Sequence, residues 1–219
     1  MSTITPQILL RAYAAGIFPM AESAEDNALY WVEPDERGII PLDGLKISAS
    51  LRKSVRRGGF DIRIDYDFTG VITQCAARTA DRKSTWINNR IVSLYTQLHR
   101  LGCCHSVEAW HEGKLVGGLY GVRIGAIFFG ESMFSRVTDA SKVALVHLVA
   151  RLNAGGFRLL DAQFVNPHLQ RLGAIQLPKH EYHKVMEPLL GQNADFFAFN
   201  ADRDPEAVLK LAMGQHLRG

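Results

Sequence analysis

The sequence predicts an α+β fold, in which a small loop-rich domain at residues 1–44 precedes a larger domain at residues 45–219. The chain has 219 residues, of which 47% are hydrophobic and 21% charged, a balance typical of a globular protein with a buried core. Runs that alternate like strands are grouped in its middle, between segments with a helical period. Grouped strands joined by short turns, with helices before and after them, favour an α+β arrangement.

The first 44 residues contain one predicted helix and a long stretch without regular structure. Thr5 can cap the helix, Pro6 suits its first turn, and Gly16 ends it. The stretch at 17–43 holds three prolines and several acidic residues. We expect it to be irregular and to depend on the rest of the chain for a core.

The region from 45 to 102 predicts two strands, three helices and a polar loop. The strands are expected at 45–48 and at 60–65, where apolar and charged side chains alternate. The helices are expected at 50–57, 68–76 and 89–101, and glycines directly follow the first and the third. The loop is expected at 78–84.

The centre of the chain predicts an antiparallel meander. Its strands are expected at 105–110, 114–122 and 126–130, with Glu112-Gly113 and Gly125 in the turns. A helix at 139–153 and a strand at 158–163 follow, and this strand can join the sheet through a right-handed crossover. Helical turns at 167–172 and 180–190 and a last helix at 205–217 complete the chain. This order resembles the acyltransferase fold of the GNAT superfamily.

Several classes of protein are excluded by what the sequence lacks. Its three cysteines, Cys75, Cys103 and Cys104, form no C-x-x-C pair, so we expect a reduced, cytoplasmic protein with no disulfide framework. The histidines lack metal-ligand spacing, and we expect no metal. No stretch predicts a signal peptide or a membrane span. Phosphate-loop, dinucleotide-binding and nucleophile-elbow motifs are all missing from the sequence.

Three polar residues are candidates for chemistry. Asp161 and Gln163 are two residues apart on a predicted strand, so they should share a face, and Glu131 follows an apolar run. A carboxylate beside a carboxamide can orient an amine and hold a polar reaction centre. From the spacing alone, a buried polar pair that only completes a hydrogen-bond network is the favoured interpretation.

The net charge of +3 hides a strongly basic segment. Six bases and one acid fall between residues 46 and 63, a local net charge of +5. On a helix, Arg52 lies beside Arg56, and Lys53 beside Arg57, at a spacing where like charges repel. Such a face fits the phosphate backbone of a nucleic acid, although a solvated basic face explains the segment about equally well. Trp31 and Trp86 could stack on a nucleobase or lie in the core.

Ordered motifs run along most of the chain, from about Leu9 to about Tyr182. They are Ala12-Tyr13 with Gly16-Ile17-Phe18-Pro19, Tyr30-Trp31 with Pro34-Asp35 and Arg37, Thr85-Trp86-Ile87, His105-Ser106-Val107-Glu108, residues 115–122, residues 129–135, Ala140-Ser141-Lys142, and Leu160-Asp161-Ala162-Gln163. Together they resemble the leucyl/phenylalanyl-tRNA–protein transferase family. The runs at 115–122 and 129–135 are long and specific, so chance is a poor explanation.

The resemblance implies an aminoacyltransferase whose catalytic domain, at 45–219, is GNAT-like. It would move Leu or Phe, with Met left open, from aminoacyl-tRNA to the α-amine of proteins that begin with Arg or Lys. The product would be an N-degron that directs the protein to proteolysis. The resemblance implies no cofactor and no metal. We expect a cytoplasmic monomer that has no membrane partner.

The resemblance also implies roles for individual residues. The catalytic residues would be Asp161, Gln163 and Glu131. The pocket for the donor side chain would be formed by Leu119, Phe128, Leu145, Leu148, Leu152 and Leu160. The 3′ adenosine would lie against Trp86, Tyr95, Asn166, Tyr13 and Met20, where Met20 stands in a position that holds Trp in many members. Arg52, Lys53, Arg56 and Arg57 would bind the tRNA.

Two other functions remain as alternatives. A CoA-dependent GNAT acetyltransferase would need backbone N–H groups that cradle a pyrophosphate before the helix at 139–153, and the loop at 135–138 lacks glycine. A non-catalytic RNA-binding module would explain the basic segment and Trp86. It would leave Glu131, Asp161 and Gln163 without a role.

Overall fold

A seven-stranded mixed sheet forms the centre of the protein, which confirms the α+β class. The computed structural model describes residues 4–26, 28–78, 84–200 and 203–215. In sheet order the strands are β4 (Asp61–Ile64), β5 (Cys104–His111), β6 (Lys114–Ile124), β7 (Ile127–Ser135), β8 (Leu159–Gln163), β3 (Glu36–Ile40) and β9 (Ile175–Pro178). All neighbours are antiparallel except β7 and β8, which are parallel.

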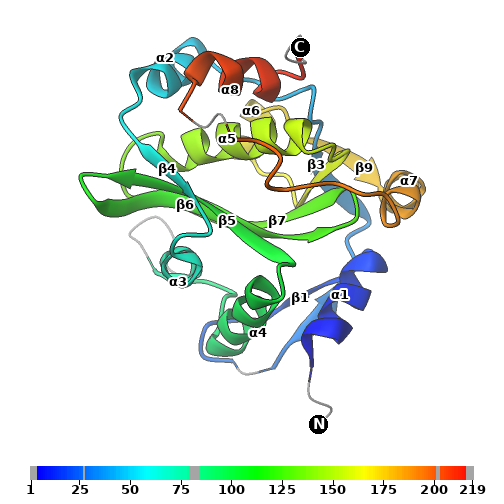
Figure 1. The fold of residues 1–219 in the computed structure, drawn as a ribbon. Helices are drawn as coiled ribbons and strands as arrows, with labels where there is room; N and C mark the ends of the chain where they lie inside the picture. Colours follow the sequence, from blue (N-terminus) through cyan, green and yellow to red (C-terminus); the bar gives the residue numbers. More distant parts are fainter. Residues whose placement is uncertain (1–3, 27, 79–83, 201–202, 216–219) are drawn as a thin grey trace.

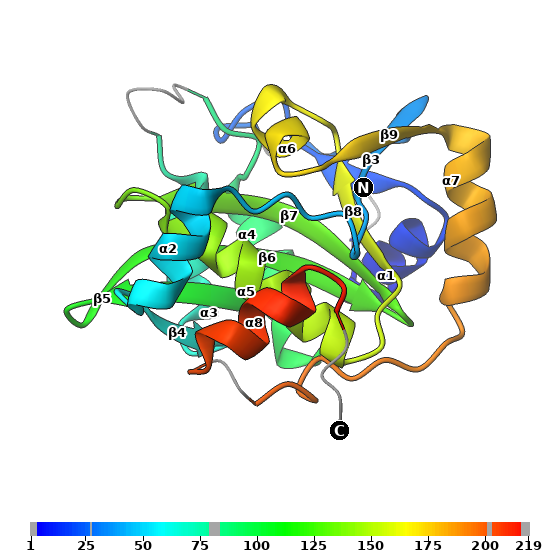
Figure 2. The same cartoon turned by 90° about the horizontal axis from the view of Figure 1, so that it is seen from above.

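Helices cover both faces of this sheet (Figure 1). One face carries α5 (Ala140–Ala154), α2 (Ala49–Arg57) and α8 (Pro205–Ala212). The other face carries α1 (Pro6–Ala14), α3 (Phe68–Ala76) and α4 (Asn89–Arg100), together with a small sheet of β1 (Phe18–Met20) and β2 (Tyr30–Val32). The short α6 (Pro167–Arg171) and α7 (Lys179–Met186, followed by a 3₁₀ turn at Glu187–Leu189) lie toward the β9 edge (Figure 2).

The sheet separates two hydrophobic cores. Neighbouring residues of β6 point to opposite faces, so Leu119 belongs to the core under α5 and Tyr120 to the core under α3 and α4. Close contact with α5 depends on Gly117, where an added Cβ would lie 2.5 Å from the Cβ of Ala140. The glycines of β6 therefore serve packing as well as chain geometry.

The meander and the main helices confirm the sequence prediction, whereas two segments contradict it. The segment at 45–48 is not a strand; it runs across α5, where Leu45 and Ile47 are buried. Its Lys46 N–H donates to Leu172 O at 2.9 Å rather than to a strand neighbour. The stretch at 17–43, expected to be irregular, contains β1, β2 and β3. Those strands pair with partners that local sequence patterns do not reveal.

Smaller differences concern the edges of elements. β9 was not expected, and β7 continues to Ser135 instead of ending at residue 130. The last helix ends at Ala212, and its expected extension to 217 runs past the described residues. Most of the expected loop at 78–84 also lies outside them. The division between residues 44 and 45 stays a prediction, and β3 from the first part is hydrogen bonded within the large sheet.

Candidate active site

A cavity of about 330 Å³ opens where β7 and β8 separate. The two strands pair from Ile127 with Leu159 to Phe129 with Asp161, and beyond this point β7 follows β6 while β8 follows β3. Ten of the predicted site residues line the cavity: Met20, Trp86, Leu119, Glu131, Leu145, Leu148, Leu160, Asp161, Gln163 and Asn166. The seam in the sheet thus collects residues that lie far apart in sequence.

A β-bulge directs Glu131 into this seam. Tyr120 pairs with Ser132 and Gly121 with Gly130, so Glu131 is the extra residue between two paired positions. The Tyr13 hydroxyl donates to Glu131 Oε1 at 2.6 Å and the Tyr95 hydroxyl to Oε2 at 3.0 Å. The two tyrosine hydroxyls also contact each other. Helices α1 and α4 therefore hold the Glu131 carboxyl group through their tyrosine hydroxyls.

Burial raises the pKa of Glu131 to about 7. Hydrogen bonds from Tyr13 and Tyr95 act in the opposite direction because they stabilise the carboxylate, and the neighbouring charge of Asp161 raises the pKa further. The pKa values of both tyrosine hydroxyls are raised well above their usual value, mainly by burial. Near neutral pH, Glu131 is therefore the member of this cluster that gains or loses a proton, whereas the two tyrosine hydroxyls stay protonated.

Gln163 lies at the end of β8 and contacts Glu131. Its side-chain Nε2 donates to Glu131 Oε1 at 3.0 Å. The residue has a φ of 55°, in the left-handed region, which turns the chain out of the strand. Gly38 stands opposite in β3, where an added Cβ would lie 2.8 Å from Val165 Cγ2. Because Gly38 has no side chain, β3 can lie close to the turn after β8 that directs the Gln163 amide toward Glu131.

Asp161 is fully buried, with 0% of its surface exposed. Its Oδ1 accepts from Arg37 Nε at 3.1 Å and from the Gln163 backbone N–H at 2.7 Å. Its Oδ2 accepts from Arg37 Nη2 at 2.7 Å and from the Tyr182 hydroxyl. Spacing predicted that Asp161 and Gln163 share a face; both line the cavity, and the Gln163 backbone N–H also joins them. Asp161 thus borders the cavity with both carboxylate oxygens already engaged by protein donors.

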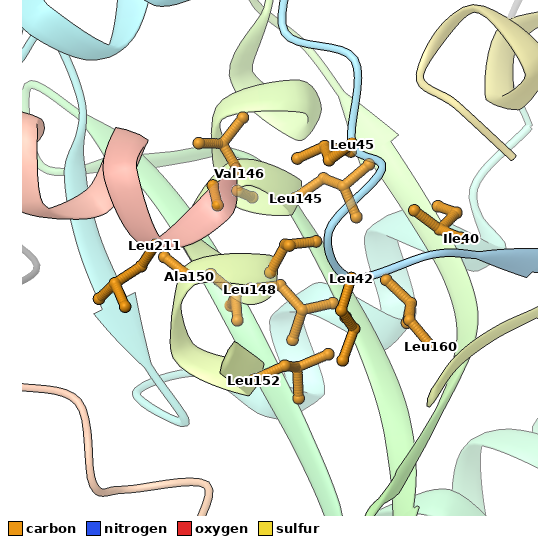
Figure 3. Close-up of a cluster of buried hydrophobic side chains, with 14 of the residues drawn as sticks. Ile40, Leu42, Leu45, Leu145, Val146, Leu148, Ala150, Leu152, Leu160 and Leu211 are labelled. Carbon is orange, nitrogen blue, oxygen red and sulfur yellow. The ribbon is translucent and has the colours of Figure 1, made fainter. Parts of the chain in front are cut away.

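The apolar end of the cavity lies toward α5. Leu119, Leu145, Leu148 and Leu160 line it together with Met133, and their role as the donor pocket stays a prediction. Figure 3 shows the α5 leucines beside Ile40, Leu42 and Leu160.

Two predicted pocket residues do not line the cavity. Leu152 is fully buried at the far end of α5, beyond Leu148. Phe128 precedes the point where the strands separate, and its ring stacks on Phe196 at 5.6 Å. Both residues pack the core rather than the pocket.

The opposite end of the cavity is aromatic. Trp86, Met20, Phe18 and Phe164 line it, and Phe164 is 49% exposed. Asn166 also borders this end, where its Oδ1 caps α6 by accepting from the Leu169 N–H at 2.9 Å.

The positions of Tyr13 and Tyr95 do not fit the prediction that these residues contact the adenosine. Both are fully buried, and their hydroxyls bind Glu131 instead of lining the cavity. Their place on α1 and α4, beneath the bulge of β7, leaves them no exposed face on which a ring could stack.

The predicted tRNA-binding residues lie together on the exposed side of α2. The helix buries Leu51 and Val55 and exposes Arg52, Lys53, Arg56 and Arg57. Arg56 forms an exposed ion pair with Glu206 at 2.7 Å, so this cation is partly neutralised. Arg52 Nε donates to Ile47 O at 3.2 Å. The four cations therefore share the exposed side of α2 but differ in their contacts.

Four residues at or beside the cavity had no role predicted from the sequence: Arg37, Tyr182, Phe18 and Phe164. Arg37 stood in one of the family motifs, and an arginine at a strand position that demands burial signals a buried carboxylate partner. Burial by itself lowers the pKa of Arg37, and the Asp161 carboxylate more than offsets this, so the net shift is upward. No local pattern marks Phe164, because its exposure at the cavity depends on the turn at Gln163.

Neither a metal centre nor a membrane segment emerges from the described ranges. In residues 4–26, 28–78, 84–200 and 203–215, no group of three or more His, Cys, Asp or Glu side chains could hold a metal ion. Within the same part of the chain, the helices are too short or too polar to cross a bilayer.

The chemistry of the seam fits a substrate with an apolar side chain at one end, a flat ring at the other, and a reactive carbonyl between them. Such a site suits an enzyme that transfers an acyl group to an amine. Sequence comparison narrows the class. A profile described as leucyl/phenylalanyl-tRNA protein transferase matches residues 39–187, and the profile of that family's N-terminal domain matches residues 2–35. The chain belongs to the leucyl/phenylalanyl-tRNA–protein transferase family.

Curated relatives agree with this assignment over nearly the whole chain. The leucyl/phenylalanyl-tRNA–protein transferase of Rhodopseudomonas palustris is 55% identical over 212 residues, which cover 97% of this chain and 94% of the relative. That of Afipia carboxidovorans is 56% identical, with 97% and 93% covered. Among solved structures, L-PGS from Bacillus licheniformis aligns with a TM-score of 0.40 at 12% identity, covering 74% of this chain and 51% of that one. A TM-score this low does not establish a shared fold.

Proposed function

We propose that the protein transfers Leu or Phe from aminoacyl-tRNA to the α-amine of proteins that begin with Arg or Lys. The observation that carries the proposal is the Glu131–Gln163 contact in the lining of a cavity that has leucines at one end and aromatic rings at the other. We call the position of this contact the neck of the cavity. Membership of the family supports the donor and the reaction. The choice of Arg or Lys acceptors rests on the family resemblance.

The apolar end would hold the donor side chain. Leu119, Leu145, Leu148 and Leu160 offer no hydrogen-bond partner there, so burial of the donor is favourable by roughly 0.8 kcal/mol for each CH₂ group. A charged side chain would lose its hydration without compensation. The aromatic end, with Trp86 and Phe164, would hold the terminal adenosine of the tRNA by stacking.

The carbonyl of the aminoacyl ester would then lie at the neck. The acceptor nitrogen forms a bond to the carbonyl carbon, the ester C–O bond breaks, and the 3′ ribose hydroxyl leaves. One proton passes from the amine to the leaving oxygen. We assign this proton transfer to Glu131, which would take the proton from the amine and give it to the leaving oxygen. A carboxyl with a pKa of about 7 can accept and return a proton near neutral pH.

Gln163 would orient the amine for this attack. Its amide nitrogen is engaged with Glu131, which leaves the carbonyl oxygen on the other branch of the amide for an N–H of the acceptor. Sequence reasoning left Asp161 open as the proton acceptor. Its complete burial and its bonds to Arg37, Tyr182 and Gln163 favour Glu131 for that step and a supporting role for Asp161.

The remaining proposals concern the molecule as a whole. Arg52, Lys53, Arg56 and Arg57 would contact the tRNA backbone from α2. The enzyme would act as a cytoplasmic monomer. The meander, the following helix α5 and the parallel strand β8 support a GNAT-like arrangement for residues 45–219.

Single-turnover transfer of Leu tests the assignment of the neck residues. Glu131→Gln and Gln163→Ala should each lower the rate at least about ten-fold with little loss of tRNA affinity, because neither residue belongs to the basic surface. Gln192→Ala is the matched control, since this exposed glutamine lies outside the cavity lining and should transfer at the normal rate. A normal rate in both neck variants would reject the assignment.

A further inference from the structure

We propose that Arg37 is the positioning residue of this active site, acting with Tyr182 through Asp161. The inference rests on the proposed transferase function. Arg37 lies in β3, is only 1% exposed, and does not line the cavity itself. Its role is to fix the groups that do line the cavity.

Arg37 binds the Asp161 carboxylate with two of its nitrogens. Nε lies 3.1 Å from Oδ1 and 3.0 Å from Oδ2, and Nη2 lies 2.7 Å from Oδ2. The Tyr182 hydroxyl from α7 adds a further hydrogen bond to Oδ2. Planar guanidinium and carboxylate groups that meet in this way fix orientation as well as distance.

Asp161 passes this orientation on to the reaction centre. Its Oδ1 accepts the Gln163 backbone N–H at 2.7 Å, at the residue whose φ of 55° turns the chain toward the neck. The Gln163 side chain then contacts Glu131 at 3.0 Å. Rotation of the Asp161 carboxylate would therefore move both groups that we assign to the chemistry.

The same guanidinium also fixes the aromatic wall. Nη1 donates to Gly16 O at 2.9 Å, two residues before Phe18, and the guanidinium carbon lies 4.6 Å from the centre of the Phe18 ring. On the other side it lies 4.9 Å from the centre of the Tyr182 ring. One buried cation thus links β1, β8 and α7 around the cavity.

A purely structural role would leave this arrangement unexplained. A buried ion pair contributes little net stability on average and can often be replaced by apolar residues. Here, two of the groups in contact with Arg37 also lead directly to the cavity: Phe18 lines it, and Asp161 anchors Gln163. That connection, rather than stability, accounts for an arginine at this buried position.

Arg37→Lys and Tyr182→Phe test the proposal in the full-length protein. Lysine keeps the charge and loses the forked geometry, and phenylalanine removes only the hydroxyl. We expect kcat to fall roughly 10- to 100-fold in Arg37→Lys and by a smaller factor in Tyr182→Phe, because small displacements of reacting groups have effects of this size. KM for aminoacyl-tRNA should stay within about two-fold in each variant.

Arg151→Lys is the matched control. Arg151 is also buried, donates to Phe196 O at 2.9 Å and lies over the Phe196 and Phe199 rings, and none of these three residues lines the cavity. Its replacement should lower Tm about as much as Arg37→Lys while kcat changes by less than about two-fold. Equal reductions of kcat in the two arginine variants, or an unchanged kcat in Arg37→Lys, would overturn the proposal.

Hydrogen exchange of the Gln163 amide separates this proposal from the proposed function. Arg37→Lys should lower its protection, and Arg151→Lys should not, whether or not the protein transfers an amino acid. Absence of transfer by the unaltered protein would reject the transferase function alone. Unchanged protection in Arg37→Lys would reject the positioning role alone.

Discussion

At the scale of single residues, the site depends on how three side chains divide the work. Glu131 borders the cavity with a pKa raised by burial, Gln163 would orient the amine in the proposed reaction, and Asp161 borders the cavity with both carboxylate oxygens engaged. The family motifs predicted these three residues together. They could not predict that the hydroxyls of Tyr13 and Tyr95 hold Glu131, because that interaction requires α1 and α4 to meet under the bulge of β7.

The raised pKa of Glu131 predicts a pH-dependent stability. Since burial raises the pKa from 4.5 to about 7, the stabilising contribution of the protonated form is complete below about pH 4.5 and is lost as pH rises through about 7. Relative to Glu131→Gln, the free energy of unfolding should therefore fall between these pH values, by on the order of 1–3 kcal/mol. Urea unfolding at several pH values measures it, and parallel curves for the two proteins would contradict the assignment.

The same group predicts the pH profile of transfer. The rate should rise as Glu131 ionises near pH 7, because only the carboxylate can accept the amine proton. Glu131→Gln should lose this step and keep any rise that belongs to the acceptor amine, whose usual pKa is about 8. Single-turnover rates over a range of about pH 5.5–9 test the profile, and a step near pH 7 that persists in Glu131→Gln assigns the proton elsewhere.

The apolar end predicts a change in donor choice. Leu148→Phe should fill the cavity and lower transfer of Phe relative to Leu by about ten-fold, because the larger donor loses its space. Leu152→Phe, on the same helix but outside the lining, should lower Tm and leave the ratio of the two donors unchanged. Competition between the two charged tRNAs measures the ratio; an equal change in both variants would remove Leu148 from the pocket.

At the scale of elements, the sequence predicted the helices and strands whose local pattern and turn residues mark them. The helix Phe68–Ala76 begins and ends as expected, and the meander has glycines at its turns. β3, at Glu36–Ile40, was missed because it contains a glycine and follows a proline-rich stretch. It is a strand because β8 and β9, more than 100 residues away in sequence, provide hydrogen bonds on both of its sides.

A substitution at Gly38 tests whether the close approach of β3 to the end of β8 is required. A Cβ at this position would lie 2.8 Å from Val165 Cγ2 and 2.9 Å from the Phe164 carbonyl carbon, so Gly38→Ala should cost about 1–3 kcal/mol of stability and displace the turn at Gln163. We expect a lower Tm and a lower kcat. Gly59→Ala, where an added Cβ would meet nothing within 4 Å, is the control. A Gly38→Ala protein with normal Tm and kcat would show that the approach is not required.

At the scale of the whole molecule, the small net charge of +3 conceals an uneven surface. Helix α2, which carries four exposed cations, lies on one side of the sheet (Figure 1). Glu131 and Asp161 lie at the seam between β7 and β8. Composition alone could not predict this separation, because it depends on which face of the sheet each element covers. If the proposed roles are right, recognition of the tRNA backbone and the chemistry of transfer occur in different layers of the fold.

This separation predicts that tRNA binding can be weakened without change in the active site. Lys53→Glu with Arg57→Glu should lower tRNA affinity and reduce the slope of log K against log salt concentration by about 1 for each phosphate that is no longer neutralised. Arg100→Glu with Lys114→Glu makes the same change of charge at other exposed positions and should have a much smaller effect. Equal effects of the two double variants would indicate general attraction rather than a docking surface.

Transfer by the purified protein is the most direct test of the account. Leu-tRNA and Phe-tRNA are each incubated with a model protein that begins with Arg, with the same protein carrying a blocked α-amine as the control. One Leu or Phe should be added to the free amine, nothing should be added to the blocked protein, and CoA should have no effect. Absence of added amino acid under these conditions, with correctly charged tRNA, would contradict it.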